Sequence, residues 1–101
     1  MIQIIENGLN LELNKINFTA KVISSPQAKG FISISRSVVY KSQDYIIISI
    51  NKDAFKNNKT IKSIEFAENS ELLTIYEGAF SDSSIEKISM PSSLIDLKEG
   101  W

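Results

Sequence analysis

Several residue types on which enzyme chemistry depends are missing from this chain. The sequence contains no cysteine, which excludes disulfides, thiolate nucleophiles and cysteine-ligated zinc. It contains no histidine either, which removes the usual general base and the commonest metal ligand. The 4 glycines are scattered, so there is no glycine-rich phosphate loop. The sequence therefore predicts a protein that is not an enzyme and uses no metal and no cofactor.

The chain also lacks a large net charge and a long apolar run. Its 11 basic and 12 acidic side chains leave a net charge of -1, which offers no bulk attraction for nucleic acid or anionic lipid. No run approaches the roughly 18 apolar residues of a membrane span, so membrane insertion is not expected. No basic region precedes the first apolar run, which stops at Glu6, so a signal peptide is not expected. The hydrophobic content of 43% is enough for the core of one domain.

Short runs with the alternation of β-strands make up the first half of the chain. Residues 1–8 are interpreted as a frayed N-terminus, and residues 9–46 as a β-rich lead-in that caps the domain. Within the lead-in, Leu9–Leu13 alternates apolar and polar residues, as expected of a half-buried strand. Two β-branched and aromatic runs, 37–40 and 45–50, flank four polar residues and predict a β-hairpin.

The second half repeats itself at a nearly constant interval. Ile50–Phe55 recurs 25 residues later as Ile75–Phe80, and Ile61–Phe66 recurs 24 residues later as Ile85–Met90. A fixed offset in this range indicates a solenoid, in which each repeat buries its apolar side against the next. Residues 47–101 are assigned to two such repeats and a truncated third.

Stacked coils would place matching apolar side chains next to each other. We expect Phe55 to contact Phe80 and Ile64 to contact Ile88, within a mostly-β solenoid. The last coil shows no polar cap, so the chain is expected either to be a fragment of a longer array or to associate with itself through that edge. The apolar residues of the uncapped edge are Leu94, Ile95, Leu97 and Trp101.

The repeat pattern resembles the BspA-like leucine-rich repeat family. Ala54-Phe55 and Ala79-Phe80 match the Ala-Phe step of that family, and Met90-Pro91-Ser92-Ser93 matches its Ile-Pro-x-Ser step. The resemblance extends roughly from Leu9 to Trp101. It implies a curved solenoid with one short parallel strand per repeat, in a surface antigen or secreted protein that adheres to host proteins and is not an enzyme. The compartment is unknown from the sequence itself.

Charged side chains are unevenly distributed over the repeats. Lysines gather in the first repeat, and acidic side chains dominate the second. One interpretation is a basic nucleic-acid patch beside an acidic patch, and another is a set of solvated turns. A third follows from the solenoid, because residues one repeat apart are lateral neighbours. It predicts that Lys52 lies near Glu77 and that Lys62 lies near Glu86, in exposed pairs of small energy.

The polar positions of the repeat strands are the candidate binding surface. Their side chains must point away from the core, and neighbouring rows on a solenoid form an extended docking surface. We therefore predict a non-catalytic protein–protein interaction module with an unidentified protein partner. The alternative is a structural spacer with no binding site of its own, in which these positions only keep the surface soluble. The candidate binding residues are Ser33, Lys62, Ser63, Glu65, Glu86, Lys87 and Ser89.

Overall fold

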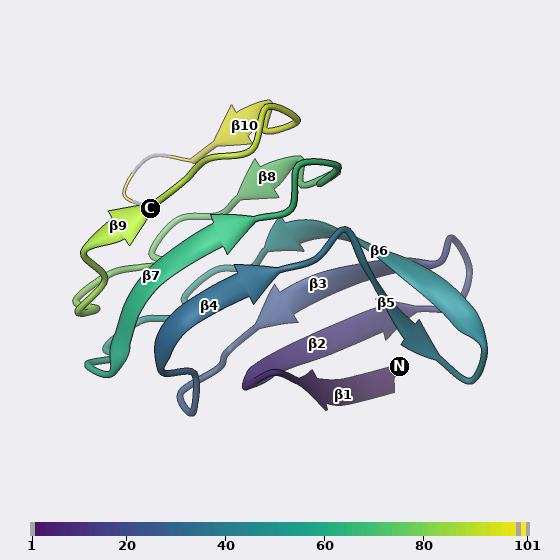
Figure 1. Cartoon of the computed structure of the whole chain (residues 1–101), viewed down its shortest axis with the longest axis horizontal. Helices are drawn as coiled ribbons and strands as arrows, with labels where there is room; N and C mark the ends of the chain where they lie inside the picture. Colours follow the sequence, from purple (N-terminus) through teal and green to yellow (C-terminus); the bar gives the residue numbers. More distant parts are fainter. Residues whose placement is uncertain (1, 99, 101) are drawn as a thin grey trace.

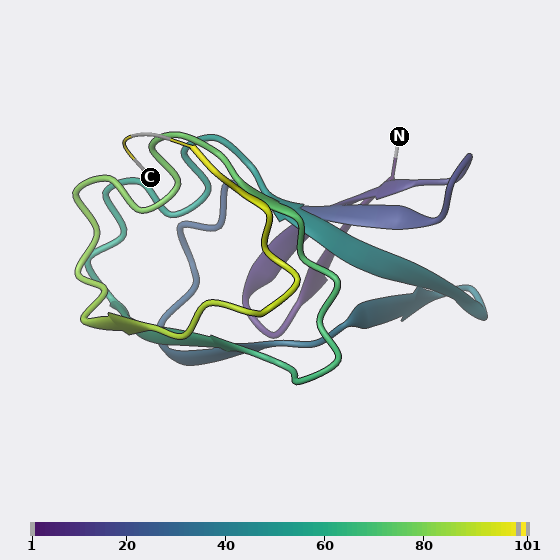
Figure 2. The same cartoon turned by 90° about the horizontal axis from the view of Figure 1, so that it is seen from above.

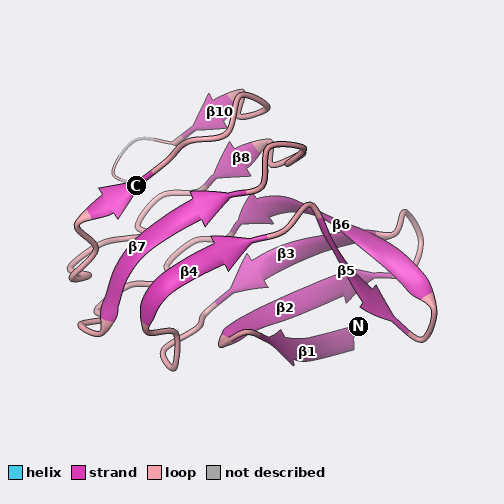
Figure 3. Ribbon diagram, viewed as in Figure 1, coloured by secondary structure: helices cyan, strands magenta, loops and turns pink. Residues whose placement is uncertain are grey.

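The computed structural model describes residues 2–98 and residue 100. Over this part the chain forms two β-sheets and no helix (Figure 3). The large sheet contains β1 (Ile2–Glu6), β2 (Leu9–Asn14), β3 (Thr19–Ile23), β5 (Ser37–Tyr40), β6 (Gln43–Ile50), β8 (Thr74–Ile75) and β10 (Asp96–Leu97). The small sheet contains β4 (Gly30–Ile34), β7 (Ile61–Phe66) and β9 (Lys87–Ile88).

From β3 onward the chain alternates between the two sheets and so winds into coils. β3, β6, β8 and β10 are neighbours in the large sheet and pair in parallel, while β4, β7 and β9 do the same in the small sheet. Figure 1 shows the windings side by side from the N-terminal to the C-terminal end, and Figure 2 shows them superposed along the coil axis. The predicted mostly-β solenoid is confirmed. Each full coil contributes one strand to each sheet, so a repeat holds two short parallel strands where the sequence analysis expected one.

Matching apolar residues of successive coils touch, as the repeat predicted. The rings of Phe55 and Phe80 stack with centroids 5.4 Å apart and an interplanar angle of 7°. In the small sheet Ile64 is the register partner of both Ile32 and Ile88. Ile32 and Ile64 are buried in the single core cluster, and Ile88 packs against it. Lateral stacking of side chains one coil apart therefore builds the core.

The N-terminal segment differs from the frayed start that was expected over residues 1–8. Residues 2–6 form β1, which pairs antiparallel with β2 over five register positions. The connecting residues Asn7 and Gly8 have φ angles of 50° and 80°. Two consecutive positive φ angles are typical of a type I′ hairpin turn, for which Asn-Gly is a preferred sequence. The parallel ladders also begin at β3, inside the stretch that was interpreted as the lead-in.

The hairpin predicted between residues 37–40 and 45–50 is present as β5 and β6. Its turn is shorter than expected, because Gln43 and Asp44 belong to β6 and only Lys41 and Ser42 connect the strands. Both connecting residues have positive φ angles, 49° at Lys41 and 65° at Ser42. The left-handed conformation is unfavourable for such side chains.

Substituting the β5–β6 turn should therefore stabilise the fold. We expect the double change Lys41→Asn and Ser42→Gly to raise the free energy of unfolding by about 1 kcal/mol, because Asn-Gly adopts this turn with less strain. Urea denaturation measures the change. The reversed order, Lys41→Gly with Ser42→Asn, is the composition-matched control and should stabilise less. A lower midpoint for the Asn-Gly variant would contradict the turn geometry.

The last coil exposes part of its apolar surface. Ile95 is 81% exposed and Leu97 is 41% exposed, whereas Leu94 packs against the core. The expectation of an apolar edge included Trp101, which lies outside the described residues. The main chain of this coil nevertheless continues the stack, since the Gly78 N–H donates to the Gly100 carbonyl at 2.9 Å.

Candidate binding surface

The outer face of the small sheet carries the predicted binding residues. In β4 and β7, Ile32, Ile34, Ile61 and Ile64 are buried, because the strands turn these side chains toward the core. Strand alternation directs Phe31 and Ser33 of β4 outward. In β7 a register shift opposite Gly30 and Phe31 lets Ile61 and Ile64, which are three residues apart, both face the core. The predicted residues on this outer face are all exposed except Ser63, which is half-buried.

A shallow depression on this face brings six of the seven predicted residues together. We call it the face depression, and its volume is about 480 Å³. Ser33 lies outside its lining, but the Ser33 hydroxyl is hydrogen-bonded to Glu65 Oε1 at 3.2 Å. The depression spans all three strands of the small sheet. Its lining residues are Phe31, Lys62, Ser63, Ile64, Glu65, Glu86, Lys87 and Ser89.

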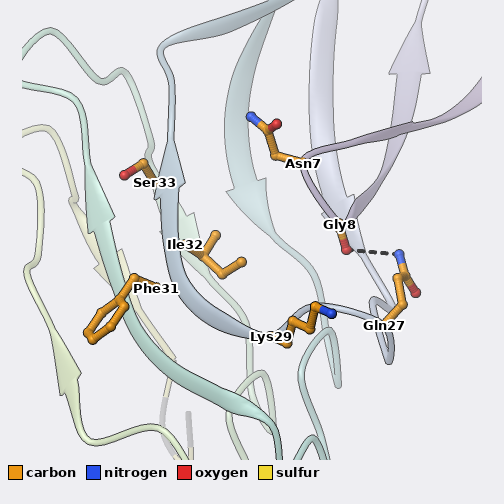
Figure 4. Close-up of a pocket in the computed structure, with 7 residues that line it drawn as sticks. All are labelled: Asn7, Gly8, Gln27, Lys29, Phe31, Ile32 and Ser33. Atoms are coloured by element: carbon orange, nitrogen blue, oxygen red, sulfur yellow. Dashed lines mark hydrogen bonds between the residues drawn. The ribbon is translucent and has the colours of Figure 1, made fainter.

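Phe31 is the residue of this surface that the sequence analysis missed. Its side chain is 85% exposed, although it lies in a strand whose neighbour Ile32 is buried. Figure 4 shows Phe31 and Ser33 on one side of β4 and Ile32 on the other. The signal was available in the alternation of residues 31–34, because fixing Ile32 and Ile34 inward forces Phe31 outward.

Charges of both signs line the face depression. Lys62 and Lys87 supply the cations, and Glu65 and Glu86 supply the anions. The Glu86 N–H donates to the Lys62 carbonyl at 2.8 Å, so these residues are lateral neighbours as predicted. None of the four charged side chains forms an ion pair in the described part of the chain. Their charges are therefore available to a partner, although Glu65 also accepts the Ser33 hydroxyl.

The predicted charge pairing between coils is wrong at the level of side chains. Lys52 and Glu77 form no ion pair in the part of the chain that the structure describes. The ion pairs observed there are Arg36 with Glu71 and, at 2.7 Å, Lys98 with Asp96. The hydrogen bond from the Lys98 ammonium to Asp96 raises the pKa of this exposed lysine. The repeat spacing predicts which backbone segments are neighbours, but it does not determine the rotamers of long exposed side chains.

The described part of the chain, residues 2–98 and 100, bears on two further kinds of site. No group of three or more acidic, histidine or cysteine side chains in this range could hold a metal ion. The same range contains no helix with the length and apolarity that crossing a membrane requires.

The repeats, the two parallel ladders and the stacked columns define a leucine-rich repeat solenoid. The model of the family described as "BspA type Leucine rich repeat region (6 copies)" matches residues 31–101. The chain therefore belongs to the BspA-type leucine-rich repeat family. No protein with a curated description is significantly similar to it.

Two solved structures share the fold. One is a leucine-rich repeat protein from Bacteroides capillosus ATCC 29799, with a TM-score of 0.79 and 19% identity, and the match covers 94% of this chain and 70% of that one. The other is a leucine rich cell surface protein from Faecalibacterium prausnitzii A2-165, with a TM-score of 0.73 and 17% identity. That match covers 97% of this chain but 27% of the longer protein. At these identities the likeness concerns the fold.

Family membership fixes the general kind of protein. Leucine-rich repeat domains are generally non-enzymatic modules and typically mediate protein–protein interactions. Proteins of the BspA type are generally associated with the cell surface. The chain is thus a repeat-protein module.

Proposed function

We propose that this chain binds a protein partner through the outer face of the small sheet. The observation that carries the proposal is the face depression, in which six polar residues lie beside one exposed aromatic ring. The ring belongs to β4, three of the polar residues belong to β7, and the other three lie in or next to β9, so segments that are distant in sequence meet at one surface. An exposed aromatic ring beside polar side chains is typical of a binding surface, whereas a surface that only maintains solubility does not need such a ring.

Each part of the face depression has a distinct role in such binding. Phe31 is the anchor, because burying an aromatic side chain in a partner supplies most of the available apolar energy. Lys62, Glu65, Glu86 and Lys87 set the partner and its orientation through charge complementarity, which affects specificity and association rate more than affinity. The expected partner surface therefore carries an apolar pocket flanked by charges of both signs.

A role at the cell surface supports the choice of partners to test. One structural neighbour is a cell surface protein, and BspA-type proteins are generally surface-associated. We infer an adhesin-like module whose partners are extracellular proteins. The exposed side chains of Ile95 and Leu97 offer the chain a second mode of contact, association with another copy.

A charge-swap experiment tests the proposal. The chain would be screened on an array of purified extracellular proteins, and any binder would be titrated with the double variant Glu65→Lys/Lys87→Glu and with Phe31→Ala. We expect each to weaken binding by about tenfold or more while leaving the unfolding midpoint close to the original. Weaker binding with an unchanged unfolding midpoint would show that these side chains contact the partner and that the fold is intact.

The matched control is the double variant Glu12→Lys/Lys21→Glu. These two residues are register partners in β2 and β3 of the large sheet, and the swap also conserves net charge. Binding should survive this change. Equal weakening by both swaps would place the partner elsewhere, and binding to nothing on the array would favour the structural-spacer alternative.

A further inference from the structure

The two sheets of the solenoid end differently at the N-terminal side. In the large sheet β3 is followed outward by β2 and β1, which cover its edge. In the small sheet no strand of the described chain lies beyond β4, which pairs with β7 alone. An edge strand presents unpaired main-chain N–H and C=O groups that can pair with another chain. The hairpin of β1 and β2 therefore caps one sheet and leaves the other open.

The register identifies which groups of β4 are free to pair. The Gly30 N–H donates to the Thr60 carbonyl, and the Ile34 carbonyl accepts from the Ala67 N–H. Gly30, Ile32 and Ile34 thus turn their main-chain groups toward β7, because alternate residues of a strand face opposite edges. The N–H and C=O groups of Phe31 and Ser33 point to the open side.

A hollow lies beside this open edge. Its volume is about 430 Å³, and we call it the edge depression. Gln27 holds the wall opposite β4 in place, since its Nε2 donates to the Gly8 carbonyl at 2.8 Å (Figure 4). The same Nε2 also donates to Asn10 Oδ1 at 3.0 Å. The edge depression is lined by Asn7, Gly8, Gln27, Lys29, Phe31, Ile32 and Ser33.

We propose that the free edge of β4 binds an extended peptide segment of a partner protein as an added strand. Main-chain hydrogen bonds to Phe31 and Ser33 would hold the peptide, and alternate side chains would lie beside Ile32 or beside the exposed ring of Phe31. Lys29 is the one charged side chain among the lining residues, so the peptide carries an acidic residue at that end. A second copy of β4 is a poorer occupant, because residues 29–35 contain no carboxylate to face Lys29.

Peptides of about six residues displayed on phage, the usual length of a strand, are the probe. Selection on the whole chain should enrich sequences that alternate β-branched and polar residues and include an acid. Resynthesised peptides should bind the Ser33→Pro variant at least about tenfold more weakly, because proline removes the outward-facing N–H and keeps the ladder to β7. The matched Ser33→Ala variant removes the hydroxyl but retains the N–H, and should bind like the original chain.

A second measurement keeps the test decisive if Ser33→Pro does not fold. N-methylation of the peptide amides that face β4 should abolish binding, and methylation of the alternate amides should not. In amide hydrogen exchange, the Phe31 and Ser33 amides should exchange rapidly in the free chain, and the peptide should slow them. The proposal would be overturned if no peptide were enriched or if exchange at these two amides did not change. It would also be overturned if their protection rose with chain concentration in the absence of peptide, because a second copy would then occupy the edge.

This inference does not rest on the proposed function of the face depression. The Glu65→Lys/Lys87→Glu variant should keep its affinity for the selected peptides, because neither residue lines the edge depression. Peptides that lose affinity for this variant and bind Ser33→Pro normally would belong to the face depression and would count against the edge site.

Discussion

Replacing Asn58 with alanine should lower the free energy of unfolding by roughly 3–5 kcal/mol, at about 1–3 kcal/mol for each buried group left unpaired. Asn58 is 5% exposed and ties the second coil to the first. Its Nδ2 donates to the carbonyls of Ala28 at 2.8 Å and Ser25 at 3.3 Å. Its Oδ1 accepts from the N–H groups of Thr60 at 2.9 Å and Ile61 at 3.0 Å. Alanine removes these four bonds and a fifth, which Thr60 Oγ1 donates to Asn58 Oδ1 at 2.9 Å. The Thr60 and Ile61 N–H groups then lose their acceptor, whereas the Ala28 and Ser25 carbonyls still accept from Thr60 Oγ1 and from the Ala28 N–H.

Urea denaturation of Asn58→Ala and of Asn69→Ala provides the comparison. Asn69 is an exposed turn residue, so its replacement should change the free energy of unfolding by no more than about 0.5 kcal/mol. An Asn58→Ala loss below about 1 kcal/mol would show that water replaces the side chain and that the bridge between the coils is dispensable.

The Asn58→Asp variant separates the two halves of this hydrogen-bond network. A carboxylate keeps the acceptor for Thr60 and Ile61 but faces two carbonyl oxygens, and burial also raises the pKa of the new carboxyl group. A raised pKa in the folded state means that the protonated form is favoured, so stability is greatest at low pH and falls as pH rises. We expect this variant to be nearer to the original chain at about pH 4 than at about pH 7. An equal deficit at both values would contradict the role of the Nδ2 donor.

Much of the solenoid was predictable because side chains one coil apart must touch. The offset that relates Phe55 to Phe80 and Ile64 to Ile88 is a direct consequence of the length of one winding, and both pairs are in contact or in register. Outward-facing polar positions followed from the same alternation. Six of the seven positions named from the sequence line one depression, although the sequence contained no information on its shape.

The features that were missed depend on turn geometry or on very short strands. Asn7-Gly8 is a strong hairpin signal, but the short apolar run before it was interpreted as a frayed end. β8 is only two residues long, Thr74–Ile75, and such a segment has no detectable period. The free edge of β4 also has no sequence signal, because a strand records which side chains face inward but not which neighbour is absent.

Replacing Phe55 with alanine should cost about 3–5 kcal/mol, the usual range for a fully buried phenylalanine. Phe55 is 0% exposed, and its ring stacks on Phe80 of the next coil. Its N–H donates to the Ala79 carbonyl at 2.7 Å, so the backbone continues to hold the coils together while the ring is lost. The cavity would therefore collapse incompletely, and the loss would lie toward the upper part of that range. Thermal or urea unfolding followed by circular dichroism measures it.

Phe31→Ala is the matched control, because the same truncation at an 85% exposed ring should change the free energy of unfolding by no more than about 0.5 kcal/mol. A double-mutant cycle with Phe55→Ala and Phe80→Ala isolates the stacking term, which should be about 0.5–1.5 kcal/mol. Additive losses at Phe55 and Phe80 would mean that the two rings stabilise their own coils independently. Non-additive losses would show that the contact between the two rings stabilises both coils together, as expected of a solenoid in which each repeat is stabilised by its neighbours.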